Sequence, residues 1–214
     1  MSKIFAIGHF KTGTTSYSFA VRMMGLVDIH FPLKYAEHLQ ETGDVYWDAR
    51  PWDSISNMNE VEYELCDKTY PDSKFILTTR NVDKWLVSIQ KHMKTVWPPR
   101  LQKLLDWRSS KIFGCPCNIE GYHEAHFKRV FLEHEEGVRD YFAGTKQLLV
   151  LPLESTTKME DLAKFLGKRI PYPRTNVAST GLVSPGLPML VEDATKEGYP
   201  KKPAFLQFED LVKW

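Results

Sequence analysis

The feature that most constrains this chain is a short apolar run, a glycine-containing loop and a helical pattern, in that order, at its start. The apolar run extends from Ile4 to Ile7 and stops at Gly8, which is typical of a buried strand in a parallel sheet. The helical pattern begins at Thr14 and ends at Gly25. Because the first N–H groups of a helix are unpaired and its dipole favours an anion there, this order predicts a phosphate-binding loop.

The residues inside the loop suit a phosphate group. Gly13 allows the backbone to approach an anion closely, and Lys11 supplies a positive charge. The alternative is a turn rich in Gly and Thr that only caps a helix, and such a turn would not need the lysine. We therefore expect the phosphate to be bound by Lys11, Thr12, Gly13, Thr14, Thr15 and Ser16.

The loop departs from the Walker A pattern of ATPases and kinases. That pattern, G-x-x-x-x-G-K-[ST], places lysine after the last glycine and a hydroxyl on Mg²⁺. Here Gly8 and Gly13 keep the spacing, but Lys11 precedes the second glycine and Thr14 stands where the lysine would be. No apolar strand ends in a clear magnesium-binding aspartate. These departures argue against metal-dependent ATP chemistry.

A second basic residue follows another apolar run. This run, at 75–79, ends at Arg80, and the helical pattern that begins at Asn81 carries Ser88 two turns later. An arginine at the end of a parallel strand lies at the edge where open α/β sheets bind ligands, and its guanidinium can clamp a phosphate. In the alternative, Arg80 pairs with Asp83 as a local cap. Together with the loop, the pattern favours a second phosphate site at Arg80 and Ser88.

Apolar runs alternate with helical patterns along the chain. Further strands are expected at 26–29, 74–79 and 148–153, and further helices at 32–40, 57–70, 81–96, 122–142 and 158–166. Asn57 is expected to cap its helix, with Val61, Leu65 and Cys66 facing inward. Residues 41–56 are expected to form an irregular loop, and 100–120 give no clear pattern. The alternation predicts an α/β fold with three layers, αβα, around a central parallel sheet.

Length and composition limit the class of protein. The 214 residues suit one domain, 1–214, in which 172–214 are expected to form a loop-rich C-terminal wrap that ends in a helix at 208–214. The formal net charge of +1 predicts no nucleic-acid partner. No stretch approaches the roughly 20 apolar residues of a membrane span. Three cysteines suit a reducing compartment, so we expect a cytoplasmic protein.

The two phosphate motifs together resemble those of the sulfotransferases that use 3′-phosphoadenosine 5′-phosphosulfate (PAPS). Lys11 to Ser16 is similar to that family's 5′-phosphosulfate loop, P-K-x-G-T-[TS], with Phe10 in place of proline. The stretch from Arg80 to Ser88 is similar to its 3′-phosphate motif, R-[ND]-P-x-[DE]-x-x-x-S, with Val82 in place of proline. The resemblance covers about residues 3–176 and is nearest to a compact subgroup found mostly in microbes and fungi.

The resemblance implies a P-loop NTPase-like sulfotransferase fold with PAPS as donor, 3′,5′-ADP as product and no metal. The loop would hold the 5′-phosphosulfate, and Arg80 with Ser88 would hold the 3′-phosphate. The acceptor would be a hydroxyl or amine of a small molecule or glycan. Because charge develops on the leaving phosphate oxygen, we expect Lys11 to be catalytic.

Several residues are candidates for the base that removes the acceptor's proton. His30, in Ile29-His30-Phe31-Pro32, resembles the H-x-P segment that carries the base in the cytosolic sulfotransferases, and imidazole titrates near neutral pH. The alternative is a polar residue that merely ends a strand. Other candidates for the base are His9 in the loop, and Asp48 and Asp53 on either side of Pro51. The expected acceptor-binding residues are His9, Trp47, Asp48, Trp52 and Asp53.

Two other functions are compatible with the same fold. A P-loop kinase of a small metabolite or nucleotide would need magnesium-dependent ATP binding, which the position of Lys11 disfavours. A non-catalytic nucleotide-binding protein would bind 3′,5′-ADP without turning over any acceptor. Cys115 and Cys117, without a second pair or suitably spaced histidines, are a weak indication of a metal site, so none is expected.

Overall fold

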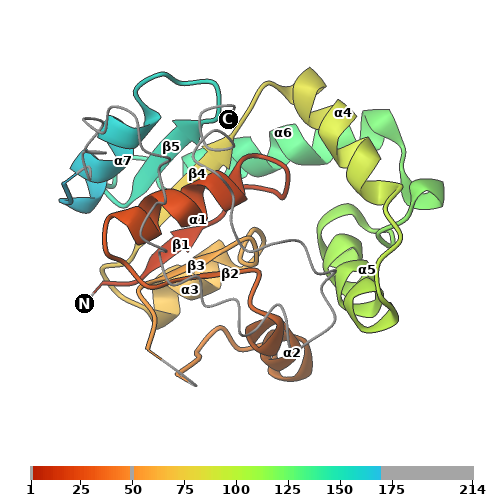
Figure 1. Ribbon diagram of the computed structural model, residues 1–214, viewed down its shortest axis with the longest axis horizontal. Helices are drawn as coiled ribbons and strands as arrows, with labels where there is room; N and C mark the ends of the chain where they lie inside the picture. The colour runs from red at the N-terminus through yellow and green to blue at the C-terminus, as the bar shows by residue number, and fades with distance from the viewer. Residues whose placement is uncertain (1, 49–50, 170–214) are drawn as a thin grey trace, which may run out of the picture. The chain divides into compact units, whose positions relative to one another are not determined.

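Five parallel strands form the centre of the fold in a computed structural model that describes residues 2–48 and 51–169 (Figure 1). The strands β1 (Ile4–Ala6), β2 (Asp28–His30), β3 (Ser54–Ser56), β4 (Lys74–Thr79) and β5 (Leu148–Pro152) are arranged in the order β2-β3-β1-β4-β5. The central strand β1 aligns its Phe5 with Ile55 on one side and with Phe75 on the other. The predicted α/β class with a parallel sheet is confirmed.

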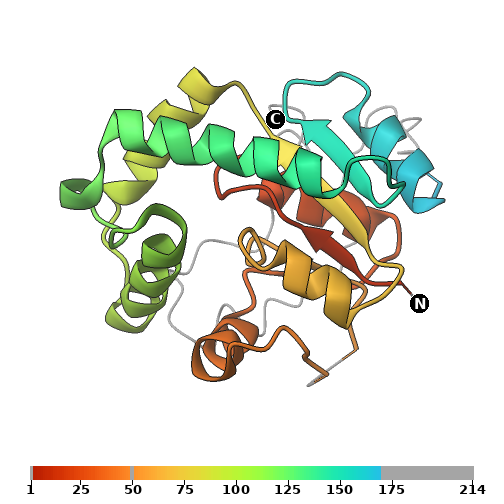
Figure 2. The same cartoon turned by 180° about the vertical axis from the view of Figure 1, so that it is seen from behind.

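Helices cover both faces of this sheet and give the predicted three layers. The helices of the described residues are α1 (Thr14–Met23), α2 (Leu33–Thr42), α3 (Tyr63–Thr69), α4 (Val82–Met93), α5 (Pro99–Phe113), α6 (Glu124–Tyr141) and α7 (Lys158–Leu166). In Figure 1 α1 lies in front of the sheet, and Figure 2, seen from behind, shows α3 and α6 over the opposite face.

Alternate strand residues supply the two layers of core. Ile4 and Ala6 pack with residues of α1 and α7 on one face. Phe5 points to the other face, where it stacks on Phe75 and shares a core with residues of α2, α3, α5 and α6. Since successive side chains of a strand point to opposite faces, both faces are removed from water, as a fully parallel sheet requires.

The segment 41–56, expected to be a loop, contains strand β3. The strand has a single apolar residue, Ile55, between two buried serines, so no apolar run marks it in the sequence. The serine hydroxyls are satisfied inside the fold: Ser54 Oγ lies 2.9 Å from the Tyr17 hydroxyl, and Ser56 Oγ donates to Asp28 Oδ2 at 2.9 Å. The prediction was wrong because internal partners allow serine in a buried strand.

The helix expected at 57–70 starts later, at Tyr63. Asn57 does not cap it but ends β3 with a left-handed backbone, φ 65°, a conformation that asparagine tolerates better than most residues. Of the three residues expected to face inward, only Cys66 is buried, while Val61 is 42% and Leu65 39% exposed.

The other elements agree more closely with the sequence. Strand β4 and helix α7 have the predicted bounds, and Asn81 caps α4 by accepting from the N–H groups of Asp83 and Lys84 at 3.1 Å each. Helix α4 ends at Met93 rather than at 96, and the second strand is shifted to 28–30. Helix α5 fills most of the segment without a clear pattern, with Pro99 in its first turn.

The chain divides into two units, Met1–Ile170 and Pro171–Trp214. The sheet and its helices belong to the first unit. The expected wrap at 172–214 and its helix at 208–214 lie outside the described residues, and a single domain over 1–214 stays a prediction.

Candidate active site

The loop between β1 and α1 has a tightly fixed shape. Lys11 and Gly13 both have a left-handed backbone, with φ of 72° and 98°, which is uncommon for lysine. Gly8 approaches β4 so closely that a Cβ there would lie 2.0 Å from the backbone oxygen of Thr78. A Cβ on Gly13 would lie 2.7 Å from Cδ1 of Leu153. The loop is therefore fixed against the ends of two neighbouring strands.

Thr12 supports the loop from inside. Its side chain is 1% exposed, and its hydroxyl bonds the backbone oxygen of His9 at 2.5 Å and Thr78 Oγ1 at 2.8 Å. Its backbone N–H also donates to the oxygen of His9, at 3.3 Å. Among the predicted phosphate-binding residues, Thr12 thus shapes the loop, and its hydroxyl is already engaged in the fold.

The start of α1 presents unpaired backbone donors. Gly13 precedes the helix without a side-chain cap, and the first bond of the helix runs from Tyr17 N to Gly13 O at 3.0 Å. The N–H groups of Thr14, Thr15 and Ser16 precede this bond and have no acceptor within the helix. Together with the helix dipole they form a site suited to an anion.

Arg80 lies beside the loop at the end of β4. Its guanidinium donates to the backbone oxygen of Lys11 at 3.1 Å, and its Nε is buried without a hydrogen-bond partner among the described residues. Within that part of the chain, neither Arg80 nor Lys11 pairs with a carboxylate, and Asp83 pairs with Lys128 instead. Burial, and next the charge of Arg80, lower the pKa of Lys11. Two neighbouring cations without a counter-charge favour a bound anion.

Helix α4 is attached directly to the loop. Trp85 is fully buried, and its indole N–H donates to the backbone oxygen of Phe10 at 3.0 Å. Ser88, predicted to bind a phosphate, follows one turn later and is half-buried. Within residues 2–48 and 51–169 its hydroxyl makes no hydrogen bond to another residue, so it is available to a ligand.

The ends of β2 and β3 meet the hydroxyls at the start of α1. Asn57 Oδ1 accepts from Thr14 Oγ1 at 3.3 Å, and His30 Nε2 lies 3.2 Å from Thr15 Oγ1. Strand β1 continues into α1 on one face, whereas its neighbour β3 continues into α3 on the other, so the loop lies at a topological switch point of the sheet. The sequence missed Asn57 because β3 was not recognised.

His30 has a second partner behind it. Its Nδ1 lies 2.9 Å from Ser56 Oγ, which in turn donates to Asp28 Oδ2. Burial, and next the charge of Arg22, lower the pKa of His30 to about 4, so its imidazole is neutral at physiological pH. A neutral imidazole beside the phosphate loop can accept a proton.

His9, expected to contact the acceptor, is buried behind the loop. It is 2% exposed, and its ring lies 4.3 Å, between centroids, from the ring of His134 in α6. His134 Nε2 bonds the backbone oxygen of Ile7 at 2.8 Å. Burial lowers the pKa of both imidazoles, that of His134 to about 4. The pair joins α6 to the end of β1.

A buried ion-pair cluster lies close to these histidines. Arg108 of α5 is 2% exposed, bonds Glu60, and pairs with Glu62 at 2.9 Å. After burial, the charge of Arg108 is among the causes that lower the pKa of both His9 and His134. No pattern in the sequence indicates this cluster, because Arg108 is 46 residues from Glu62 and 48 from Glu60, and each residue resembles an ordinary surface charge.

Four of the expected acceptor-binding residues do not meet the loop. Asp53 directly precedes β3 and accepts from the N–H of Val27 at 2.8 Å. It therefore lies at the amino-terminal end of the strands, whereas the loop lies at their carboxyl end. Trp52 is 4% exposed and donates its indole N–H to the oxygen of Trp47 at 2.9 Å, and both rings belong to the core. Asp48 is exposed next to Trp47. These tryptophans therefore pack the core under β1 and β3.

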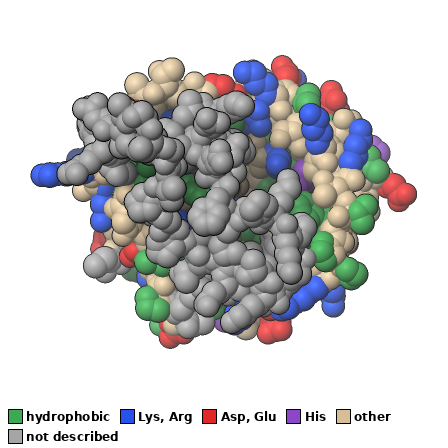
Figure 3. Space-filling model, in the orientation of Figure 1, with side chains coloured by type: hydrophobic (Ala, Val, Ile, Leu, Met, Phe, Trp, Pro, Cys, Tyr) green, Lys and Arg blue, Asp and Glu red, His purple; other side chains and the backbone are tan. Residues whose placement is uncertain are grey.

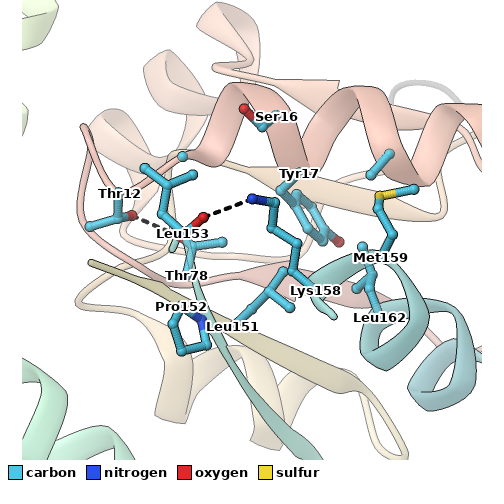
Figure 4. Close-up of a pocket in the computed structure, with 12 residues that line it drawn as sticks. Thr12, Ser16, Tyr17, Thr78, Leu151, Pro152, Leu153, Lys158, Met159 and Leu162 are labelled. Atoms are coloured by element: carbon cyan, nitrogen blue, oxygen red, sulfur yellow. Dashed lines mark hydrogen bonds between the residues drawn. The ribbon is translucent and has the colours of Figure 1, made fainter. Parts of the chain in front are cut away.

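An apolar cavity opens beside the loop, on the side of α7 (Figure 4). It measures about 390 Å³ including its open mouth, and its walls come from the start of α1, the ends of β4 and β5, and α7. Lys158 crosses its edge and donates to the oxygen of Leu153 at 2.8 Å. Because Gly13 and Ser16 are part of its wall, a group bound there adjoins the phosphate loop.

Basic side chains are present on the surface near this edge of the sheet. Figure 3 shows several Lys and Arg side chains over the region of α4, whose exposed lysines include Lys84 and Lys91. Acidic side chains lie among them, so the net field is modest. The local positive charge at Lys11 and Arg80 therefore matters more for anion binding than the surface as a whole.

Comparison with known proteins identifies the family. A sequence model of the family described as a sulfotransferase domain matches residues 3–180, and the chain belongs to this family. Among solved structures, the chain is similar to a sulfotransferase from Alicyclobacillus acidocaldarius, with 15% sequence identity, a TM-score of 0.49, and coverage of 92% of this chain and 90% of that one. No curated protein matches. The predicted family is confirmed, and with it a transferase.

Two further properties of the described residues concern membrane spans and metal sites. In residues 2–48 and 51–169, no helix has the length and apolar character that crossing a membrane requires. The same residues contain no group of three or more His, Cys, Asp or Glu side chains arranged to hold a metal ion.

Proposed function

We propose that the protein transfers a sulfuryl group from PAPS to a hydroxyl or amine of a small molecule or glycan, and releases 3′,5′-ADP. One observation carries the proposal: Lys11 and Arg80 lie side by side without a carboxylate partner in the described residues, next to the open N–H groups of α1. A donor with two separated phosphate groups would satisfy both cations and the helix start.

Each part of the donor has a matching part of the site. The N–H groups of α1, with Lys11, would hold the 5′-phosphosulfate, and Arg80 with Ser88 would hold the 3′-phosphate. The apolar cavity beside Ser16 would receive the adenine, a flat group that needs apolar walls next to the phosphates. This arrangement leaves the side of the loop that faces His30 for the acceptor.

Lys11 and His30 would perform the chemistry. As the sulfuryl group leaves, negative charge grows on the bridging oxygen of 3′,5′-ADP, and the Lys11 ammonium would stabilise it. His30, neutral in the free protein, would take the proton that the acceptor loses. Neither role involves a metal ion.

Isothermal titration with 3′,5′-ADP in the presence of EDTA tests donor binding. We expect binding without Mg²⁺, and we expect Lys11→Ala to weaken it by about 10-fold or more, since a hydrogen bond to a charged group contributes about 1.5–3 kcal/mol. Release of 3′,5′-ADP from PAPS with a panel of acceptors should fall by about 100- to 1,000-fold in the same variant.

Lys146→Ala is the matched control, because Lys146 is an exposed lysine in the turn before β5. It should change neither quantity. No binding of 3′,5′-ADP by the wild-type protein would contradict the proposed function, and binding of ATP that requires Mg²⁺ would favour the P-loop kinase instead.

A further inference from the structure

Four side chains form a chain of three hydrogen bonds that leads away from the loop into the protein. Thr15 Oγ1 lies 3.2 Å from His30 Nε2, His30 Nδ1 lies 2.9 Å from Ser56 Oγ, and Ser56 Oγ lies 2.9 Å from Asp28 Oδ2. Ser56 is fully buried and Asp28 is 5% exposed. The chain therefore begins at the phosphate loop and ends at a carboxyl group enclosed by the fold.

The number of protons in this chain determines the tautomer of His30. A serine hydroxyl has one proton, and Ser56 donates it to Asp28. Ser56 can then only accept from Nδ1, so the imidazole proton must be on Nδ1. It follows that Nε2 has no proton and that Thr15 donates its hydroxyl to Nε2.

We infer that Asp28 and Ser56 are positioning residues that hold the His30 proton on Nδ1 and leave Nε2, which faces the phosphate loop, free to take the acceptor's proton. The role as proton acceptor rests on the proposed function, whereas the tautomer of His30 follows from the hydrogen bonds alone and does not require a bound donor. Nothing in the resemblance to other sulfotransferases indicated either residue.

These side chains account for every proton that moves during the proposed sulfuryl transfer. The acceptor oxygen or nitrogen displaces Thr15 from Nε2, attacks the sulfur of the donor and forms a new bond to it. The bond between sulfur and the bridging oxygen breaks, and its electron pair stays on 3′,5′-ADP. The acceptor's proton moves to Nε2, and the imidazolium that results keeps its Nδ1–H bond to Ser56. The carboxylate of Asp28, reached through the Ser56 hydroxyl, compensates the new positive charge.

The surroundings of Asp28 are consistent with a carboxylate. Arg22 of α1 donates to the backbone oxygen of Asp28 at 2.9 Å and places a positive charge beside it. Burial raises the pKa of Asp28, and hydroxyls of Ser18, Ser54 and Ser56, together with Arg22, oppose this shift. If Asp28 were protonated, it would donate to Ser56 and Ser56 would donate to Nδ1, which would place the imidazole proton on Nε2. The tautomer of His30 therefore shows in which direction the hydrogen bonds between Asp28, Ser56 and His30 run.

Nuclear magnetic resonance of protein labelled with ¹⁵N-histidine tests the inference directly, with His30→Gln used to assign the signals. In the wild-type protein we expect Nδ1 of His30 to be protonated and Nε2 to be an unprotonated acceptor. In Ser56→Ala and in Asp28→Asn, the tautomer with the proton on Nε2 should gain population. The turnover number should fall by about 10- to 100-fold, as for other partners that orient a histidine, while affinity for 3′,5′-ADP should stay within about twofold.

Ser73→Ala is the matched control, because Ser73 is also fully buried and hydrogen-bonded. It directly precedes β4, at the end of the strands that lies away from the loop. It should leave the His30 signals unchanged. A wild-type His30 with its proton on Nε2 would overturn the inference without any variant having to fold, and so would an unchanged tautomer in Ser56→Ala. A failure of 3′,5′-ADP to bind would contradict the proposed function alone, because the tautomer is measured without ligand.

Discussion

Two arginines on either side of the phosphate loop have opposite environments. Arg80, at the end of β4, donates to the backbone of Lys11 and has no carboxylate partner among the described residues. Arg108, on α5, is 2% exposed and bonds both Glu60 and Glu62. Both lie near the loop, one beside Lys11 and the other close to His9.

This difference separates charges that bind from charges that support the fold. A cation that is already paired inside the protein offers nothing to an anionic ligand, whereas an unpaired cation beside open N–H groups does. By this criterion Arg80 belongs to the proposed donor site and Arg108 to the structure behind it. The loop is thus open on one side and tightly supported on the other.

The largest effect that follows from the comparison concerns Arg108. Arg108→Ala would leave Glu60 buried without a positive partner, while Glu62 would keep only Lys111, at 3.3 Å. Breaking a buried pair in this way costs about 3–5 kcal/mol. Denaturant unfolding monitored by circular dichroism should show this loss. Arg129→Ala, which removes an exposed pair with Glu133 at 2.8 Å, should cost no more than about 1 kcal/mol. Equal losses of unfolding free energy in the two variants would show that Arg108 supports the fold no more than an exposed arginine does.

The second prediction concerns Arg80. Arg80→Ala should weaken 3′,5′-ADP binding by about 10- to 100-fold, since a charge-assisted bond to phosphate contributes about 1.5–3 kcal/mol. The free energy of unfolding without ligand should hardly change, because no carboxylate is left unpaired. Titration calorimetry and denaturant unfolding on the same preparation measure both. A large loss of stability with unchanged affinity would show that Arg80, like Arg108, supports the fold.

The smallest expected effect is a loss of stability at low pH, caused by the histidines that are buried near the loop. The pKa of His134 in the folded protein is about 4, below its ordinary value of 6.5, so the unfolded chain binds more protons in between. Stability is therefore fully present above about pH 6.5 and is lost as the pH falls towards 4. The pKa values of His9, His30 and His92 are shifted in the same direction and contribute to the same loss.

His134→Gln isolates one of these protons, because glutamine stays neutral and keeps an amide donor for the oxygen of Ile7. Between about pH 6.5 and 4, the slope of unfolding free energy against pH should become shallower by up to about 1.4 kcal/mol per pH unit. Denaturant unfolding at several pH values measures it. An unchanged slope would mean that His134 is not held neutral behind the loop.

The sequence predicted the sheet where strands are apolar and missed it where they are not. Strand β4 has three consecutive buried apolar residues, Phe75, Ile76 and Leu77, and was predicted with correct bounds. Strand β3 consists of Ser54, Ile55 and Ser56, and its hydroxyls are satisfied by Tyr17 and Asp28, which are distant in the sequence. Partners of this kind cannot be recognised before the fold is known.

The candidate site shows the same division. Lys11, Gly13 and Arg80 follow from local patterns, because a loop after a strand and a strand end have positions set by the fold class. Asn57, Ser56 and Glu60 depend on the unrecognised strand and could not be found. Trp47 and Trp52 were expected at the acceptor pocket because they lie in an irregular stretch, yet aromatic rings in such a stretch can equally fill the core.

The supports of the loop have a consequence for how the protein is made. The phosphate loop is complete within the first sixteen residues, but it is fixed by Thr78, His134 and Leu153. During synthesis the nascent chain therefore cannot fix this loop until α6 and β5 have left the ribosome, and contacts this distant in sequence form slowly. An early segment that ends before α6 would expose the strands of an unfinished parallel sheet, and exposed strand edges make such an intermediate prone to aggregation.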